Sequence, residues 1–217
     1  MNLKVNLGKD INNNDFNVDL EKEDIHFIIL VGTSGFGKSV FHYNLYKQLI
    51  DQNKPEELGF IFFDMTMVDF AGWKSPYVIT FIAGDGVKAL KKFEEISKKE
   101  SVKRLIIHIE EMTMLEVSTA RFEKALSDTL KNNPNAFVVC STSRPSNDVL
   151  TPKIRSLADL LVVFNLASSE DSKFLGAEGA ENFTIPGQHM LILKNEKITC
   201  KPLSESDVKN DGDFFQQ

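Results

Sequence analysis

An eight-residue segment near the start of the chain has the residue types and spacing of a phosphate-binding loop. Residues 32–39 read GTSGFGKS and fit the pattern G-x-x-x-x-G-K-[ST]. In such a loop the glycines let backbone N–H groups approach phosphates, the lysine reaches the terminal phosphates, and the last hydroxyl ligates Mg²⁺. The segment therefore predicts an ATP and Mg²⁺ site that includes Gly32, Thr33, Ser34, Gly35, Phe36, Gly37, Lys38, Ser39 and Val40.

Two consecutive acids follow an apolar run in the middle of the chain. Residues 105–109 read LIIHI, and Glu110 and Glu111 come directly after them. Beside a phosphate-binding loop, such a pair is suited to hydrolysis: we expect Glu110 to hold the metal with Ser39 and Glu111 to polarise the attacking water. The same acids would also suit the start of a helix, because the helix dipole favours negative charge there. Given the loop upstream, we prefer the catalytic interpretation.

A polar cluster follows the next apolar run. Residues 141–146 read STSRPS and come directly after residues 136–140. If this loop lies beside the phosphate-binding loop, Ser143 is placed to sense the terminal phosphate through a hydrogen bond. Clusters of Ser, Thr and Pro also form ordinary loops. The residues alone leave both interpretations open.

The elements that position these residues follow from the apolar pattern. Residues 86–99, 115–131 and 40–50 have helical periodicity, and residues 3–18 predict a hairpin around three consecutive asparagines. Strands are predicted at residues 27–31, 60–63, 78–83, 105–109, 136–140, 160–164 and 190–193. Strands that alternate with helices predict an α/β fold with a mostly parallel, twisted sheet, helices on both faces, and ligands at the carboxyl ends of the strands.

The composition limits the class of protein. A chain of 217 residues with 42% hydrophobic content predicts one α/β core, and a net charge of −6 disfavours a protein that coats nucleic acid over its whole surface. Cys140 lies in an apolar run, so we expect Cys140 and Cys200 to be reduced thiols, which favours a cytoplasmic location. We expect no membrane span, because no apolar run has the required length.

Several segments, in order along the chain, resemble the motor domain of the FtsK/SpoIIIE/HerA family of DNA translocases. They are residues 7–10 (LGKD), 26–40, 63–70, 141–150 (STSRPSNDVL) and 187–191 (GQHML). The resemblance implies a single RecA-like P-loop ATPase domain over residues 1–203, with residues 1–20 as a hairpin lead-in and 204–217 as a flexible polar tail. It also implies ATP hydrolysis coupled to movement of double-stranded DNA by a ring of identical subunits, by resemblance a hexamer. Motors of this minimal size resemble those of viruses, plasmids and conjugative elements, with any membrane or portal partner supplied by another chain.

The chain departs from the family pattern at positions that bear on catalysis. Glu110, Ser143, Thr66 and Leu161 stand where the family has Asp, Gln, Lys and a proposed trans-acting Arg. We therefore expect the trans cation to be Arg155, which precedes the strand at 160–164. A non-hydrolysing ATP-binding scaffold is the alternative, whereas a small kinase is disfavoured because the chain has only four arginines.

Two further features have plain structural interpretations. His108 lies within the apolar run 105–109 and has no accompanying metal-ligand spacing, so we expect a satisfied core histidine rather than a ligand. The basic residues between positions 88 and 104 are more typical of a solvated helix face than of a DNA track.

Overall fold

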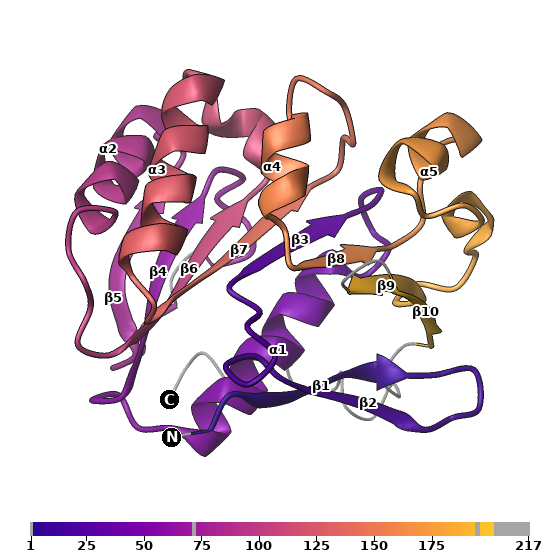
Figure 1. Cartoon of the computed structure of the whole chain (residues 1–217), viewed down its shortest axis with the longest axis horizontal. Coiled ribbons are helices and arrows are strands. Elements are labelled where there is room, and N and C mark those ends of the chain that lie inside the picture. Colours follow the sequence, from indigo (N-terminus) through magenta and orange to yellow (C-terminus); the bar gives the residue numbers. More distant parts are fainter. Residues whose placement is uncertain (1, 71–72, 194–195, 202–217) are drawn as a thin grey trace.

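A central eight-stranded sheet organises the protein, in a computed structural model that describes residues 2–70, 73–193 and 196–201 (Figure 1). The strand order is β10-β9-β8-β3-β7-β6-β4-β5; neighbours from β8 to β5 are parallel, and β9 and β10 are antiparallel. The strands are β3 (Phe27–Val31), β4 (Leu58–Asp64), β5 (Val78–Ala83), β6 (Arg104–Glu110), β7 (Ala136–Thr142), β8 (Leu160–Val163), β9 (His189–Leu193) and β10 (Glu196–Cys200).

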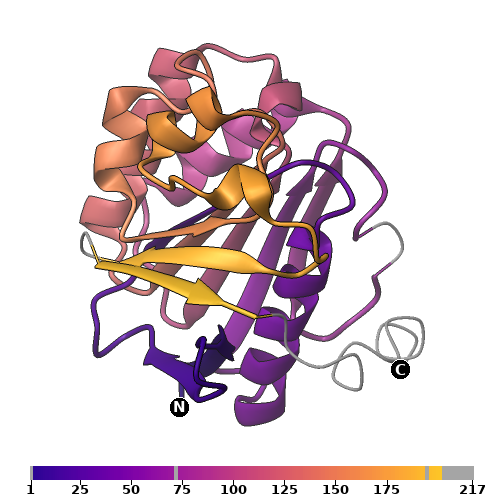
Figure 2. The same cartoon turned by 90° about the vertical axis from the view of Figure 1, so that its right-hand side faces the viewer.

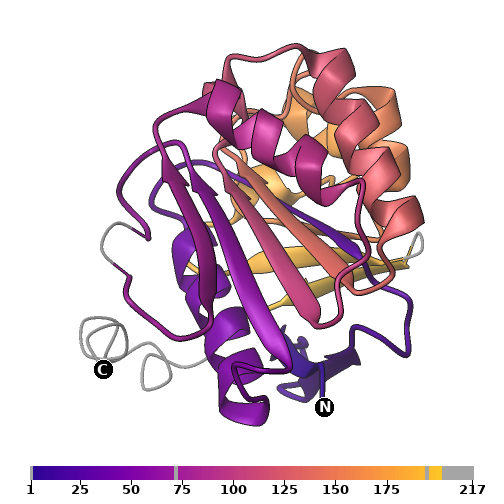
Figure 3. The ribbon, with the colours of Figure 1, turned by 90° about the vertical axis from the view of Figure 1, so that its left-hand side faces the viewer.

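Helices cover both faces of this sheet, which confirms the predicted fold class. Helix α1 (Lys38–Gln52) lies on one face, and α2 (Gly86–Ile96), α3 (Thr119–Asn132) and α4 (Pro152–Leu157) lie on the other (Figures 1 and 3). Helix α5 (Ser169–Leu175) and the 3₁₀ turns Met112–Leu115 and Ala180–Asn182 lie in connections between strands. Figure 2 shows β9 and β10 in yellow at one edge of the sheet.

The core strands are buried on both faces because helices cover both. In β3, Phe27, Ile29 and Val31 pack in the cluster under α2, α3 and α4, whereas Ile28 and Leu30 pack in the cluster under α1. Successive side chains of a strand point to opposite faces, so a strand between two helical layers reads as a continuous apolar run. That is why the sequence revealed these strands.

The predicted N-terminal hairpin is present and is fastened to α1. It consists of β1 (Lys4–Lys9) and β2 (Asp15–Asp19), which pair antiparallel. The backbone N–H of Asn6 donates to Oε1 of Gln48 at 2.7 Å, and Nε2 of Gln48 donates to the carbonyl of Asn6 at 3.0 Å. The hairpin therefore extends the layer formed by α1. The predicted flexible tail at 204–217 lies outside the described residues.

Some element boundaries differ from the sequence prediction. The helix expected at 115–131 begins at Thr119, because Ser118 caps it and residues Met112–Leu115 form a separate 3₁₀ turn. The sequence analysis missed three short elements: β10, α5, and α4, which begins at Pro152 behind the Thr151 cap. Elements of five to seven residues carry too few periodic positions for a pattern to identify them.

The structure bears on two predictions that were made from the composition, one on the cysteines and one on membrane spans. Cys140 and Cys200 are both free and buried, and the burial of Cys140 agrees with its place in an apolar run. Within the described part of the chain, no helix combines the length and apolar content that crossing a bilayer requires.

Candidate nucleotide-binding site

The strand order brings the predicted site residues together. Strand β7 lies between β3, which leads into the phosphate-binding loop, and β6, which ends at Glu110. All three strands are parallel, so their carboxyl ends lie at one edge of the sheet. The loop that carries Ser143 therefore emerges between the phosphate-binding loop and the two glutamates.

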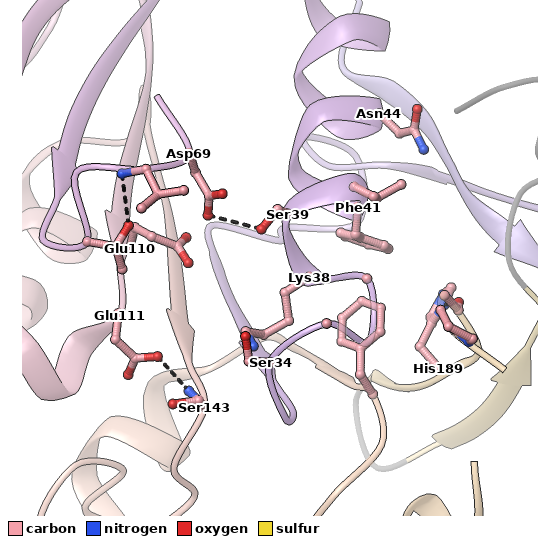
Figure 4. Close-up of a pocket in the computed structure, with 18 of the residues that line it drawn as sticks. Ser34, Lys38, Ser39, Phe41, Asn44, Asp69, Glu110, Glu111, Ser143 and His189 are labelled. Carbon is pink, nitrogen blue, oxygen red and sulfur yellow. Dashed lines mark hydrogen bonds between the residues drawn. The ribbon is translucent and has the colours of Figure 1, made fainter. Parts of the chain in front are cut away.

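A cavity of about 1080 Å³ opens at this edge (Figure 4). Its size is typical of a site for a cofactor or nucleotide. The residues that line it come from the phosphate-binding loop, α1, the loops after β4, β6 and β7, and the segment before β9: Leu7, Ser34, Gly35, Gly37, Lys38, Ser39, Val40, Phe41, Asn44, Thr66, Val68, Asp69, Glu110, Glu111, Thr113, Met114, Ser143, Phe164, Ile185, Pro186, Gly187 and His189.

The phosphate-binding loop has the geometry of an anion cradle. Gly35 and Gly37 have φ values of 82° and 103°, which side chains rarely adopt, and a Cβ on Gly35 would meet nothing within 4 Å. Helix α1 begins at Lys38, so its first N–H groups and its dipole face the loop. These features fit a triphosphate.

Lys38 lies folded against its own loop. Its Nζ donates to the carbonyl oxygens of Gly32 at 2.7 Å and Thr33 at 3.4 Å. Burial lowers the pKa of Lys38, while Glu110, Glu111 and Asp69 oppose that shift by favouring the charged form. The ammonium is therefore held at the phosphate end of the cavity, between the loop and three acids.

The remaining residues of the phosphate-binding loop contact neighbouring segments of the chain rather than the cavity. Oγ1 of Thr33 donates to Oδ1 of Asn165 at 2.8 Å, and the carbonyl of Phe36 accepts from the N–H of Gly187 at 3.0 Å. The carbonyl of Gly32 holds Lys38, and the ring of Phe36 packs on the cluster under α1. Gly32, Thr33 and Phe36 therefore position the loop without lining the cavity.

Asp69 is a site residue that the sequence analysis missed. Oγ of Ser39 donates to Oδ2 of Asp69 at 3.0 Å (Figure 4). Burial, followed by the nearby charge of Glu110, raises the pKa of Asp69 to about 6. A hydroxyl and a carboxylate are hard oxygen ligands of the kind that Mg²⁺ prefers, so this pair fits the metal edge of the site.

Asp64 fixes the loop that carries Asp69. This buried acid ends β4; its Oδ1 accepts from Oγ1 of Thr66 at 2.7 Å and from the N–H of Met67 at 2.9 Å, and its Oδ2 accepts from the N–H of Phe70 at 3.1 Å. The hydroxyl of Tyr43 also donates to the carbonyl of Asp69. The sequence does contain a pattern that could have identified Asp69 as a site residue: Asp64 ends an apolar strand, and Asp69 follows five residues later.

Glu111 and Ser143 are in contact through the backbone of the serine. Oε2 of Glu111 accepts from the N–H of Ser143 at 2.9 Å, and Oε1 accepts from Thr113 at 2.5 Å and Thr142 at 3.2 Å. Glu111 has φ 52°, a conformation that costs a non-glycine residue about 1–3 kcal/mol. The carboxylate is therefore held in a defined place at the cavity wall by three donors.

Glu110 points in a different direction from Glu111. It is only 4% exposed, and its Oε2 lies 2.9 Å from Nε2 of His108. The other ring nitrogen of His108, Nδ1, lies 2.6 Å from the hydroxyl of Tyr46. His108 is thus a buried, hydrogen-bonded core residue, as the sequence analysis expected, and it holds the acid that was assigned to the metal.

Aromatic side chains line the other end of the cavity. Phe41 on α1 makes edge contacts with Phe164 and His189, with ring centroids 5.9 and 5.4 Å apart. The ring nitrogens of His189 lie 2.8 Å from the carbonyls of Gly187 and Leu7. Asn44 adds an amide from the next turn of α1 (Figure 4). This aromatic end of the cavity fits a heterocyclic base better than a phosphate.

Arg155, the predicted trans cation, is not among the residues that line this cavity. Its Nη1 donates to the carbonyl of Phe174 at 2.8 Å, and its guanidinium carbon lies 4.0 Å from the centre of the Phe174 ring. Arg155 therefore fastens α4 to α5 within the subunit. Its assignment to the site of a neighbouring subunit stays a prediction.

Solved structures of P-loop motor domains share this fold. The conjugation coupling protein TcpA of pCW3, with ATPγS, has a TM-score of 0.75 and 18% identity over 92% of this chain and 65% of its own. The genome packaging NTPase B204 of Sulfolobus turreted icosahedral virus 2, also with ATPγS, has a TM-score of 0.63 and 17% identity over 83% of this chain and 98% of its own. The chain therefore has the fold of P-loop ATPase motor domains.

Sequence comparison identifies the family. The DNA translocase FtsK of Helicobacter pylori strain J99 is 26% identical over 255 aligned residues, and that of Campylobacter jejuni strain 81-176 is 25% identical. Both alignments cover 99% of this chain but only 30% and 26% of the relatives, so the chain spans less than a third of their length. The model of the FtsK/SpoIIIE family matches residues 1–196. On this evidence the chain belongs to the FtsK/SpoIIIE family.

Proposed function

We propose that this chain is an ATP-driven motor that moves double-stranded DNA. The observation that carries the proposal is the convergence of Lys38, Ser39, Asp69, Glu111 and Ser143 on one cavity at the carboxyl edge of the sheet. Family membership supports DNA as the substrate, because the curated relatives are DNA translocases. Motor domains solved with ATP analogues share this fold, which supports ATP as the nucleotide that drives the motor.

The chemistry that we propose is hydrolysis of the terminal phosphate. Glu111 accepts the proton of the attacking water, since its carboxylate is held beside the backbone N–H of Ser143 at 2.9 Å. Lys38 and the first N–H groups of α1 bind the phosphate oxygens. Ser39, Asp69 and the cavity-lining Glu110 supply the metal edge; when bound, Mg²⁺ would neutralise charge on the phosphates.

We also propose that the motor is a ring, by resemblance a hexamer, with the site between subunits. Large apolar side chains are exposed at the cavity: Val68, Met114 and Ile185 are 75%, 49% and 57% exposed. Such residues are normally covered, and a neighbouring subunit is the simplest cover. In a ring, that neighbour would also supply the trans cation, for which Arg155 remains our choice.

The biological setting is proposed from the relatives. A conjugation coupling protein and a viral genome packaging NTPase share the fold, so transfer of plasmid DNA and packaging of viral DNA are both suitable roles. Either role places the motor in the cytoplasm, or in the host cytoplasm for a virus. A membrane or portal protein is the further partner that we propose for either role.

An ATP-binding scaffold with little hydrolysis is the second candidate. The observation that favours it is the contact between Glu110 and His108, since an acid expected at the metal is held in the core. In that case the chain would bind ATP, and its turnover would not respond to DNA.

Two measurements test these proposals. Phosphate release is measured with and without duplex DNA; stimulation by DNA supports the motor, and ATP binding without turnover supports the scaffold. Mass photometry with an ATP analogue and duplex DNA then measures assembly. A chain that stays monomeric under those conditions would contradict the ring.

A further inference from the structure

A second group of potential metal ligands lies behind the nucleotide site. His42 comes from α1, one turn beyond Ser39, and His108 and Glu110 come from the same face of β6. One ligand atom from each of these three residues lies within 4.8 Å of the other two. The side chains are buried: the two histidines are 0% exposed and Glu110 is 4% exposed. We call these three residues the His–His–Glu cluster.

His42 is the unexplained member of this cluster. Neither of its ring nitrogens has a hydrogen-bond partner among the described residues, and its Nδ1 stops 3.5 Å from Oε2 of Glu110. Burying a polar group without a hydrogen-bond partner costs folding free energy. A buried histidine of this kind therefore indicates a bound ligand or another compensating role. A metal ion between the histidine and the carboxylate would satisfy Nδ1.

The other ring is oriented as metal-binding histidines usually are. Nδ1 of His108 lies 2.6 Å from the hydroxyl of Tyr46, which leaves Nε2 directed at Glu110. Outer partners of this kind fix the orientation of a ligating imidazole.

We propose that the His–His–Glu cluster binds a divalent transition-metal cation of the Zn²⁺ type. The carboxylate oxygen lies 2.9 Å from Nε2 of His108 and 3.5 Å from Nδ1 of His42. Bonds of about 2.0–2.1 Å in a tetrahedral site place ligand atoms about 3.3 Å apart, close to these two distances, and the ligand atoms of the two histidines, which lie within 4.8 Å of each other, would adjust to the same spacing. Because Glu110 also lines the cavity, a metal could enter from there, and the cavity offers a fourth position.

The two proposed metal positions have different types of ligand and would therefore bind different ions. Imidazole nitrogens suit Zn²⁺ and related ions, whereas the hydroxyl of Ser39 and the carboxylate of Asp69 suit Mg²⁺. A cation in the His–His–Glu cluster would hold Glu110 in the core, so the Mg²⁺ edge proposed above would then consist of Ser39 and Asp69 without Glu110. This site would also explain why position 110 carries Glu where the family has Asp, because the longer side chain reaches the histidines.

Metal binding by the nucleotide-free protein tests the proposal without reference to ATP turnover. The full chain, freed of any histidine tag, is equilibrated with Zn²⁺, and bound metal is measured by elemental analysis; Co²⁺ is used to record the visible spectrum of a tetrahedral site. We expect one equivalent per chain. His42→Phe keeps the ring volume and should weaken binding by at least about tenfold, the lower range for loss of even an outer partner.

Two controls separate this site from other positions on the chain. His26→Phe removes a histidine that stacks on Phe137, and Asp148→Asn removes an exposed acid near Arg144; both should bind Zn²⁺ as the wild type does. Circular dichroism checks that His42→Phe is folded, and His42→Gln replaces it if it is not. Wild-type protein that binds no Zn²⁺, or a folded His42 variant that binds it equally well, would overturn the proposal.

Discussion

The hydroxyl of Ser39 donates a hydrogen bond to Asp69 at 3.0 Å, across 30 residues of sequence. Ser39 is the last residue of the phosphate-binding loop and lies in the first turn of α1, and Asp69 lies in the loop after β4 that Asp64 holds in place. Asp69, rather than Glu110, is therefore the acid in direct contact with the P-loop serine. This contact leads to the first prediction.

Asp69→Asn should raise the Mg²⁺ concentration that half-maximal ATP turnover requires by roughly 10- to 100-fold. The amide removes the negative charge from the metal edge but keeps the shape of the side chain. Turnover is measured against Mg²⁺ at fixed ATP. The control is Asp148→Asn, an exposed acid near Arg144, which should change nothing. An unchanged Mg²⁺ requirement in the Asp69 variant would return the metal role to Glu110.

Lys38→Ala should weaken ATP binding by about 10- to 100-fold, since a charge-assisted hydrogen bond contributes about 1.5–3 kcal/mol. Lys38 is the only cation in the phosphate-binding loop. Binding is followed with a fluorescent ATP analogue, and circular dichroism reports the fold. The matched control is Lys47→Ala on the exposed part of α1. ATP turnover at the wild-type rate in Lys38→Ala would show that this cavity is not the ATP site.

Glu111→Gln should retain ATP binding and reduce hydrolysis by about 10²- to 10⁴-fold, because an amide cannot accept the proton of the attacking water. Phosphate release and binding of the fluorescent analogue are measured on the same sample. Glu116→Gln, an exposed residue in the same connection, serves as the control. If Glu110→Gln loses hydrolysis while Glu111→Gln keeps it, the two acids have the opposite roles.

Arg155→Ala should reduce hydrolysis by about 10³-fold or more without weakening ATP binding, if it acts in trans. Its contacts with Phe174 give it a structural role as well, so the test needs a readout that packing alone would not change. Mixing Arg155→Ala with Lys38→Ala subunits provides it. Mixed interfaces pair an intact Lys38 with an intact Arg155, and turnover should partly recover.

Absence of that recovery, together with full activity of Arg155→Ala alone, would exclude Arg155 as the trans cation. Arg144 would then be the next candidate, since it is exposed in the loop after β7. Loss of activity in Arg155→Ala without recovery on mixing would indicate a role confined to the subunit.

The sequence alone determined the parts of this protein that depend on local pattern. The GTSGFGKS loop, the apolar runs of the core strands and the acids after residue 109 could be read directly, because glycine conformation, strand burial and motif spacing are properties of neighbouring residues. Glu111 and Ser143, which both follow parallel strands, line the same cavity.

Only the tertiary structure decided which acid meets which partner. The contact of Ser39 with Asp69 and the approach of His42 to Glu110 depend on how far each loop reaches and how α1 packs against β6. The strand order also places β7 between β3 and β6, so that Ser143 stands between the phosphate-binding loop and the acids. These features arise from packing between distant segments, where side-chain direction and loop path are set by burial and hydrogen bonding that no local pattern encodes.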